Sequence, residues 1–198
     1  GDLIKYFLLK MSNYHLEGIF THFLHHLKVD IPQELLSFCY EQKKLDPVGV
    51  KLSNCGGWQS KEFIEDKSIA NNLIENILSR TSEVFTQQLL LENFWININS
   101  PDTYNSMHVH PNSNISGVIW IKIPKDSGNL YFPNPDNFQK HKEINFYKSF
   151  LNQGEGYELE PQEGNVVLFP SCLQHEVTKN LSNDERVSIS FNLSLIHI

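Results

Sequence analysis

Two histidines separated by a single residue give this sequence its most specific chemical feature. His108 and His110 lie in the segment from Tyr104 to Pro111, which is expected to be extended. In an extended chain, side chains two residues apart project to the same face, so both imidazoles can ligate one metal ion. The pair alone fits two interpretations. The two residues are either part of a metal site or polar loop histidines that bind no ligand.

A third histidine could complete such a site. His175 follows the apolar strand candidate Val166 to Phe169 and begins another extended stretch, His175 to Thr178. Histidines from two neighbouring strands would leave part of the coordination sphere open, as a catalytic metal requires and a structural metal does not. We therefore predict a metal centre formed by His108, His110 and His175.

The segment from Arg186 to Leu195 alternates between polar and apolar residues. An ordinary strand with a solvated polar face would show this pattern. In a barrel whose interior holds a polar ligand, the same face would direct the Arg186 guanidinium and the Ser188 hydroxyl inward, where they could clamp a carboxylate. The apolar positions are Val187, Ile189, Phe191, Leu193 and Leu195, and the polar positions are Arg186, Ser188, Ser190, Asn192 and Ser194.

Four other histidines lie near the N-terminus and carry less chemical information. His15, His22, His25 and His26 are interleaved with apolar residues, and no partner pattern supports a metal site there. We expect them to have surface or packing roles.

The ordered set of His108-x-His110, His175 and Arg186-x-Ser188 resembles the HxD/E…H…RxS signature of the iron(II)- and 2-oxoglutarate-dependent oxygenases. More closely, several segments resemble an uncharacterised bacterial and phage branch of that family. The likeness extends from about Asn97 to Leu195, and more weakly to Gly56 to Ser60. The resembling segments are His108 to Ser113, Ser116 to Trp120, Gly128 to Phe132 and Gly164 to Pro170.

This resemblance implies a double-stranded β-helix (jelly-roll, cupin-like) fold and a specific set of ligands. Fe(II) would be held by His108, His110 and His175, and 2-oxoglutarate would chelate it through its 1-carboxylate and keto oxygen. Arg186 would pair with the distal carboxylate, while Ser188 would donate a hydrogen bond. With molecular oxygen, such an enzyme hydroxylates a C–H bond of a primary substrate, here unknown, and releases succinate and CO2.

His110 departs from the family pattern, which has a carboxylate at this position. Three neutral imidazoles would leave the iron site one unit more positive than usual. A different assignment places His110 outside the ligand set, with Asp102 or Glu176 supplying the charge. Three further functions also fit the histidines: a zinc hydrolase or lyase, a three-histidine dioxygenase that does not use 2-oxoglutarate, and a non-catalytic jelly-roll binding module. Arg186 argues against the first two of these, because neither needs a dicarboxylate clamp.

Helical patterns occupy much of the first half of the chain. A helix is predicted from Ile31-Pro32 to Asp46-Pro47, and a longer helix from Ser68 to about Glu92, because apolar residues recur at intervals of three to four. Between them, Ser53 to Ser60 forms a Gly-rich turn with an exposed Trp58 that serves as loop architecture or as a wall of the site.

After residue 93 the apolar period becomes two, which indicates strands. We expect a single domain over 1–198 that is mainly β. Residues 1–92 would be a largely helical N-terminal support, and 93–198 a jelly-roll catalytic core. Trp120, Asn99 and Asn192 are candidates for the pocket wall and equally for packing. Strands are expected at Phe94 to Asn99, Ile115 to Ile123, Asn129 to Phe132, Asn165 to Phe169 and Arg186 to Leu195.

Composition excludes several broad classes of protein. The chain has 198 residues of which 40% are hydrophobic, enough for a packed core. A net charge of −7 provides no basic surface for broad nucleic-acid binding. The longest apolar runs, such as Leu89 to Leu91, are too short to cross a bilayer, and no signal peptide is evident.

Cysteine usage favours a cytoplasmic protein. Cys39, Cys55 and Cys172 are widely spaced and contain no CxxC pair, so neither a disulfide framework nor a thiolate zinc site is indicated. The segment Pro133 to Gly156 is long for a jelly-roll connection and is expected to act as a lid or substrate loop. Exposed strand edges would allow a homodimer. Met11 could be the natural start of the chain.

Overall fold

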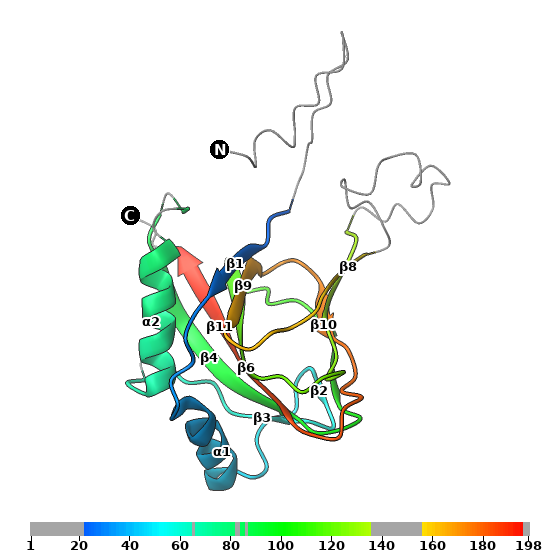
Figure 1. Ribbon diagram of the computed structural model, residues 1–198. Coiled ribbons are helices and arrows are strands. Elements are labelled where there is room, and N and C mark those ends of the chain that lie inside the picture. Colours follow the sequence, from blue (N-terminus) through cyan, green and yellow to red (C-terminus); the bar gives the residue numbers. More distant parts are fainter. Residues whose placement is uncertain (1–21, 65, 82–83, 86, 136–155, 196–198) are drawn as a thin grey trace, which may run out of the picture.

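The computed structural model describes residues 22–64, 66–81, 84–85, 87–135 and 156–195. These residues form two antiparallel β-sheets, with two helices on the outer face of the larger sheet (Figure 1). The six-stranded sheet has the order β1 (His25–Lys28), β9 (Asn165–Pro170), β6 (Ile115–Lys122), β11 (Arg186–Leu195), β4 (Leu89–Asn99) and β3 (Trp58–Gln59). The five-stranded sheet has the order β2 (Asn54–Cys55), β5 (Tyr104–His108), β10 (His175–Val177), β7 (Leu130–Pro133) and β8 (Gly156–Leu159). This architecture confirms the mainly β jelly roll that was predicted.

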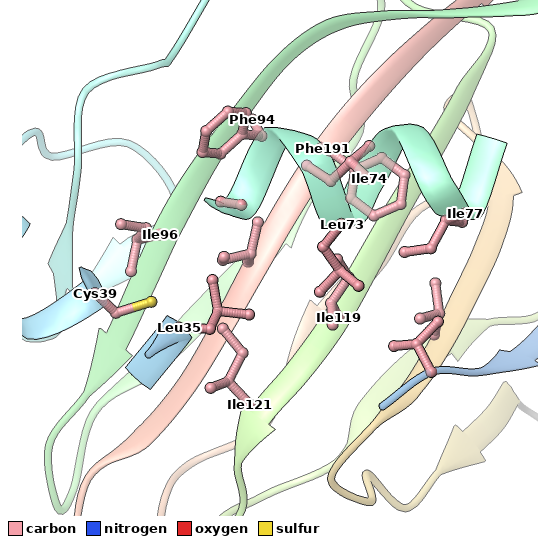
Figure 2. Close-up of a cluster of buried hydrophobic side chains, with 14 of the residues drawn as sticks. Leu35, Cys39, Leu73, Ile74, Ile77, Phe94, Ile96, Ile119, Ile121 and Phe191 are labelled. Carbon is pink, nitrogen blue, oxygen red and sulfur yellow. The ribbon is translucent and has the colours of Figure 1, made fainter. Parts of the chain in front are cut away.

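The main hydrophobic core lies between the large sheet and the helices α1 (Leu35–Leu45) and α2 (Ile69–Thr81). Figure 2 shows side chains of both helices directed at the apolar face of the strands. Burying each large aliphatic side chain contributes about 1.5–3 kcal/mol, so this contact fixes the sheet against the helices. The core side chains labelled there are Leu35, Cys39, Leu73, Ile74, Ile77, Phe94, Ile96, Ile119, Ile121 and Phe191.

Strand β11 separates this core from the interior of the jelly roll. Its residues Val187, Ile189 and Phe191 are fully buried on the helix side. The opposite face is not solvated, because Arg186 is only 1% exposed and Ser188 only 8% exposed. The polar face of β11 therefore lies inside the protein, which is the second of the two interpretations that the alternation allowed.

A second, smaller apolar cluster packs between the two sheets beside the inward polar face. It surrounds the space into which the predicted site residues project, so it excludes water from part of that space. Its buried members are Trp120, Leu130, Phe132, Val167, Phe169 and Leu173.

The prediction for the longer helix is correct only in its first half. The helix ends at Thr81, and Leu89 already begins β4. Leu89 pairs with Leu195 at the far end of β11, so long-range strand pairing overrides the helical spacing of apolar residues. The shorter helix was predicted well: it begins at Leu35 and ends at Leu45, and Asp46 is its C-cap.

The expectation of an exposed Trp58 is wrong. Trp58 lies on β3 and pairs with Ile98, and its side chain is only 7% exposed. The indole Nε1 donates a 2.8 Å hydrogen bond to the carbonyl oxygen of Asp46, which ties the Gly-rich turn to the end of α1. Trp58 is therefore part of the scaffold and does not line the inner cavity.

The N-terminal histidines that the structure describes are consistent with packing roles. His25 lies on the edge strand β1, and its ring centroid is 4.8 Å from that of Phe85. His15, Met11 and most of the predicted substrate loop, Pro133 to Gly156, lie outside the described residues. Neither helix of the described part is long and apolar enough to cross a membrane.

Candidate metal centre

Strand pairing brings the three predicted histidines together. His108, the last residue of β5, pairs directly with His175, the first residue of β10. His110 follows β5 by two residues, and its backbone N–H donates a 2.9 Å hydrogen bond to the carbonyl oxygen of Ser171. The potential ligand atoms of the three residues all lie within 4.8 Å of one another, and they form the only such cluster among the described residues.

In each of these imidazoles, one ring nitrogen is hydrogen-bonded to an oxygen atom. Nδ1 of His108 is 2.7 Å from the carbonyl oxygen of Ser106, and Nδ1 of His175 is 2.9 Å from that of Leu173. Nδ1 of His110 is 2.7 Å from Oδ1 of Asn192. A carbonyl oxygen can only accept, so each Nδ1 carries the proton and each Nε2 keeps a free lone pair. This is the arrangement of a metal-binding histidine with its outer partner in place.

Burial keeps the three imidazoles neutral. Desolvation lowers the pKa of His108 and His110 below the ordinary value, and it lowers the pKa of His175 to about 3. A neutral imidazole is the form that binds a metal, so the site needs no proton loss near neutral pH. The two candidate carboxylates do not join the group: the Asp102 side chain is 82% exposed, and Glu176 lies outside the cluster.

Aromatic rings close the sides of the histidine group. The ring centroid of Phe169 lies 4.7 Å from that of His175, and the Trp95 centroid lies 5.4 Å from that of His110. These contacts limit rotation of the imidazoles and lower the local polarity, which strengthens electrostatic interactions inside the site.

Arg186 is a buried cation that lines the same cavity. It donates Nη1–H to the carbonyl oxygens of Ser127 and Thr178, while Nη2 is buried and has no hydrogen-bond partner. No acidic side chain of the described residues forms a salt bridge with it, and desolvation lowers its pKa to about 10. A buried guanidinium that has no salt bridge would be stabilised by an anionic ligand that accepts a hydrogen bond from Nη2.

The cavity lining contains no Asp or Glu among the described residues. Besides aromatic and aliphatic groups, it carries the three imidazoles, the Arg186 guanidinium, amides and hydroxyls, so it is suited to an anion. Ser188 lines it beside Arg186. The polar lining residues are Ser53, Asn97, Asn99, Asn105, His108, His110, His175, Arg186, Ser188 and Ser190.

Some members of this wall were not predicted from the sequence. Of the three candidates for the pocket wall, Trp120 and Asn99 line the cavity and Asn192 does not. Trp95, Asn97 and Asn105 line it as well. The alternation of Phe94 to Asn99 already contained the signal for Trp95 and Asn97, because both share the face of Asn99. Asn105 could not be found in this way, because the pairing of β5 with β10 is irregular at this point.

A known family model matches the jelly-roll core of the chain. Residues 93–192 match the model of the family described as "Putative 2OG-Fe(II) oxygenase". That range contains the three histidines, Arg186 and Ser188. No curated protein gives a significant match to the chain.

Several solved structures share the fold. A Pseudomonas putida prolyl-4-hydroxylase has a TM-score of 0.61 at 16% identity, with 89% of this chain and 95% of that chain covered. The non-heme alpha ketoglutarate dependent carbocyclase SnoK from nogalamycin biosynthesis has a TM-score of 0.62 at 12% identity, covering 86% and 78%. HygX from Streptomyces hygroscopicus, with nickel, 2-oxoglutarate and hygromycin B bound, has a TM-score of 0.60 at 15% identity, covering 88% and 84%.

Proposed function

The chain belongs to the family of 2OG-Fe(II) oxygenases, and we propose on that premise that it hydroxylates a C–H bond of a primary substrate. Molecular oxygen and 2-oxoglutarate would be consumed, and succinate and CO2 released. The single observation that carries the proposal is the buried Arg186, whose Nη2 has no hydrogen-bond partner and which lines a cavity together with three neutral imidazoles.

The three histidines fit a divalent metal, and we assign to them the binding of Fe(II). His108, His110 and His175 would each use Nε2, because each Nδ1 is already held by an oxygen atom. Bound iron would supply the redox chemistry that couples decarboxylation of 2-oxoglutarate to oxygen insertion into a C–H bond. The chain supplies orientation of the ligands and a cavity partly shielded from water.

Arg186 and Ser188 fit the co-substrate. In this assignment the guanidinium pairs with the distal carboxylate of 2-oxoglutarate and the Ser188 hydroxyl donates a hydrogen bond to it. Charge supports the assignment, because the neutral triad leaves the full charge of a dication in place and the cavity lining has no carboxylate among the described residues. A dianionic chelator offsets that charge.

One observation favours a second candidate, which is a three-histidine zinc or iron enzyme that does not use 2-oxoglutarate. His110 stands where the family usually has a carboxylate, and three neutral imidazoles also suit tetrahedral zinc with a bound water. This candidate leaves the buried charge of Arg186 without a role, as does a non-catalytic binding module.

We also propose that one domain spans 1–198, with 93–198 as its catalytic core, and that the protein is cytoplasmic. The three free cysteines support a reducing compartment.

Succinate formation tests the proposal. The full chain is loaded with Fe(II) without oxygen, supplied with 2-oxoglutarate and then exposed to oxygen. We expect slow succinate formation even without a primary substrate, strongly reduced in Arg186→Ala and kept in Arg80→Ala. Arg80 is a matched control because it is an exposed arginine of α2 that donates to the carbonyl oxygen of Lys28. Stoichiometric metal binding without succinate in the unmodified protein would support the second candidate, and absence of both would support the binding module.

A further inference from the structure

His110 differs from the other two histidines in the hydrogen-bond partner of its Nδ1 atom. In His108 and His175, Nδ1 is hydrogen-bonded to the backbone carbonyl oxygen of the residue two positions earlier in the chain. His110 instead uses side chains from two other strands: Asn192 Oδ1 on β11 at 2.7 Å and Ser116 Oγ on β6 at 2.8 Å. Its tautomer is therefore set by residues that can be substituted without changing the backbone.

The orientation of the Asn192 amide is determined by a chain of hydrogen bonds. Asn192 donates Nδ2–H to Asn93 Oδ1 at 3.0 Å, and Asn93 donates Nδ2–H to Glu62 Oε2 at 3.1 Å. An ionised carboxylate can only accept, so Asn93 must present its oxygen to Asn192. Asn192 must then present its own oxygen to His110.

Two buried serines complete the same arrangement. Ser116, which is fully buried, donates Oγ–H to Asn192 Oδ1 at 3.0 Å. The Oγ atoms of Ser116 and Ser171 are 2.8 Å apart, so the Ser171 hydroxyl can donate to that of Ser116. With its proton used on Asn192, Ser116 faces His110 as an acceptor. Both groups next to Nδ1 of His110 therefore accept.

The opposite tautomer of His110 would be costly here. A lone pair on Nδ1 would face the lone pairs of Asn192 Oδ1 at 2.7 Å, which is too close for a water molecule to lie between them, and Asn192 itself is buried. An unsatisfied buried polar group costs about 1–3 kcal/mol. His110 would also then carry a proton on Nε2, which is the atom that it offers to the metal.

We propose that Asn192, supported by Ser116 and by the chain through Asn93 to Glu62, is a positioning residue that fixes His110 as the Nδ1–H tautomer. Asn192 thereby makes an imidazole usable at the position where the family usually has a carboxylate. The proposal rests on the proposed function in one respect, which is that His110 binds the metal. The tautomer itself is a property of the metal-free protein.

The first test measures the tautomer directly. Long-range proton–nitrogen NMR spectra of the metal-free full chain, labelled with 15N and assigned by comparison with His110→Gln, distinguish Nδ1–H from Nε2–H. We expect Nδ1–H in the unmodified protein and a mixture or Nε2–H in Asn192→Leu. Asn129→Leu is the matched control, because Asn129 Nδ2 donates to Glu158 and touches none of the three histidines. A predominant Nε2–H form of His110 in the unmodified protein would overturn the proposal.

The second test measures the dissociation constant for Co(II), a divalent probe that needs no turnover. Outer partners of metal-bound histidines typically affect metal affinity 10- to 100-fold, and we expect a loss of about that size in Asn192→Leu. Asn192→Asp keeps an oxygen that accepts from Nδ1–H, so it should largely retain Co(II) binding. If Asn192→Leu binds Co(II) within about twofold of Asn129→Leu, Asn192 has no positioning role.

A double substitution separates this role from general damage to the fold. In a His110→Asp background there is no imidazole to orient, so adding Asn192→Leu should cost little further Co(II) affinity. An equal loss in both backgrounds would show a structural role and contradict the proposal. Failure of the proposed function, seen as no succinate from 2-oxoglutarate, would leave the NMR and Co(II) results unchanged, so the two failures are distinguishable.

Discussion

His108 and His175 occupy directly opposite positions on the antiparallel strands β5 and β10, with ring centroids 4.3 Å apart. The small sheet therefore brings two of the three imidazoles together before any metal is bound. His175 is buried and His108 is half-buried, and the Nδ1 atom of each ring is hydrogen-bonded to a backbone oxygen. The side-chain arrangement that a metal needs is largely built into the strand pairing.

Removing one histidine of this pair should abolish tight metal binding. His175→Ala leaves two of the three ligands, so we expect Co(II) affinity to fall by more than the roughly 10- to 100-fold seen for outer partners. The measurement is the melting temperature with and without Co(II), since a ligand at 100 times its Kd stabilises a protein by about 2.7 kcal/mol. His25→Ala, on β1, should retain the full shift. A full shift in His175→Ala would contradict the assigned site.

Shortening Arg186 should weaken 2-oxoglutarate specifically. Removing one partner of a buried charge pair costs about 2–5 kcal/mol, so the KM for 2-oxoglutarate should rise by a factor of roughly 30 or more in Arg186→Ala. Arg186→Lys keeps the charge but loses the planar fork, and an intermediate KM is expected. The measurement is succinate formation against 2-oxoglutarate concentration, with Co(II) affinity as the control that should not change. An unchanged KM would contradict the assignment of Arg186 as the residue that binds the distal carboxylate of 2-oxoglutarate.

Gly128 should be intolerant of a side chain because it packs against the carbonyls near Arg186. Its φ is +91°, and a Cβ there would lie 2.2 Å from the Thr178 carbonyl oxygen and 2.8 Å from Arg186 Nη1. We expect Gly128→Ala to lower the free energy of unfolding by at least about 1–3 kcal/mol, measured by urea denaturation. Asp126→Gly is the reciprocal control, because Asp126 has a φ of 62° and glycine adopts that region freely. It should leave stability unchanged or slightly higher, and an equal loss in both variants would refute this explanation.

The three cysteines should differ sharply in reactivity. Burial raises the pKa of Cys39 to about 12, so almost no thiolate forms at pH 8, and the side chain is inaccessible. Cys172 is exposed and should react with N-ethylmaleimide first, whereas half-buried Cys55 should react more slowly. Mass spectrometry of the native protein at timed intervals measures this order. Because the pKa of Cys39 is raised, raising the pH to 9 should still leave it unmodified, and its early modification would contradict the burial described.

The strands around the site could be predicted because their two faces meet different environments. Along β11, alternate residues face the helices or the inner cavity. Apolar and polar residues therefore alternate in the sequence with a period of two. The same physics placed Phe94, Ile96 and Ile98 on the core side of β4. What alternation could not decide was whether the polar face is solvated, because that depends on the second sheet.

The errors arose where tertiary pairing overrides local pattern. Apolar spacing continues from α2 into Leu89, but Leu89 is buried as the start of β4, opposite Leu195. Trp58 sits in a Gly-rich segment that suggested exposure, yet strand pairing and a bond to the end of α1 bury it. The role of Asn192 depends on His110 and Ser116 reaching it from elsewhere in the fold, which no single segment of sequence reveals.

The most direct test of the central claim follows the oxygen atoms. The Fe(II)-loaded protein is supplied with 2-oxoglutarate under 18O2, and the succinate is analysed by mass spectrometry. A 2-oxoglutarate-dependent dioxygenase places one atom of O2 in the new carboxylate of succinate, so we predict succinate that carries one 18O. Its formation should disappear in His175→Ala and fall strongly in Arg186→Ala. Succinate without 18O, or metal-loaded protein that forms no succinate at all, would contradict the account.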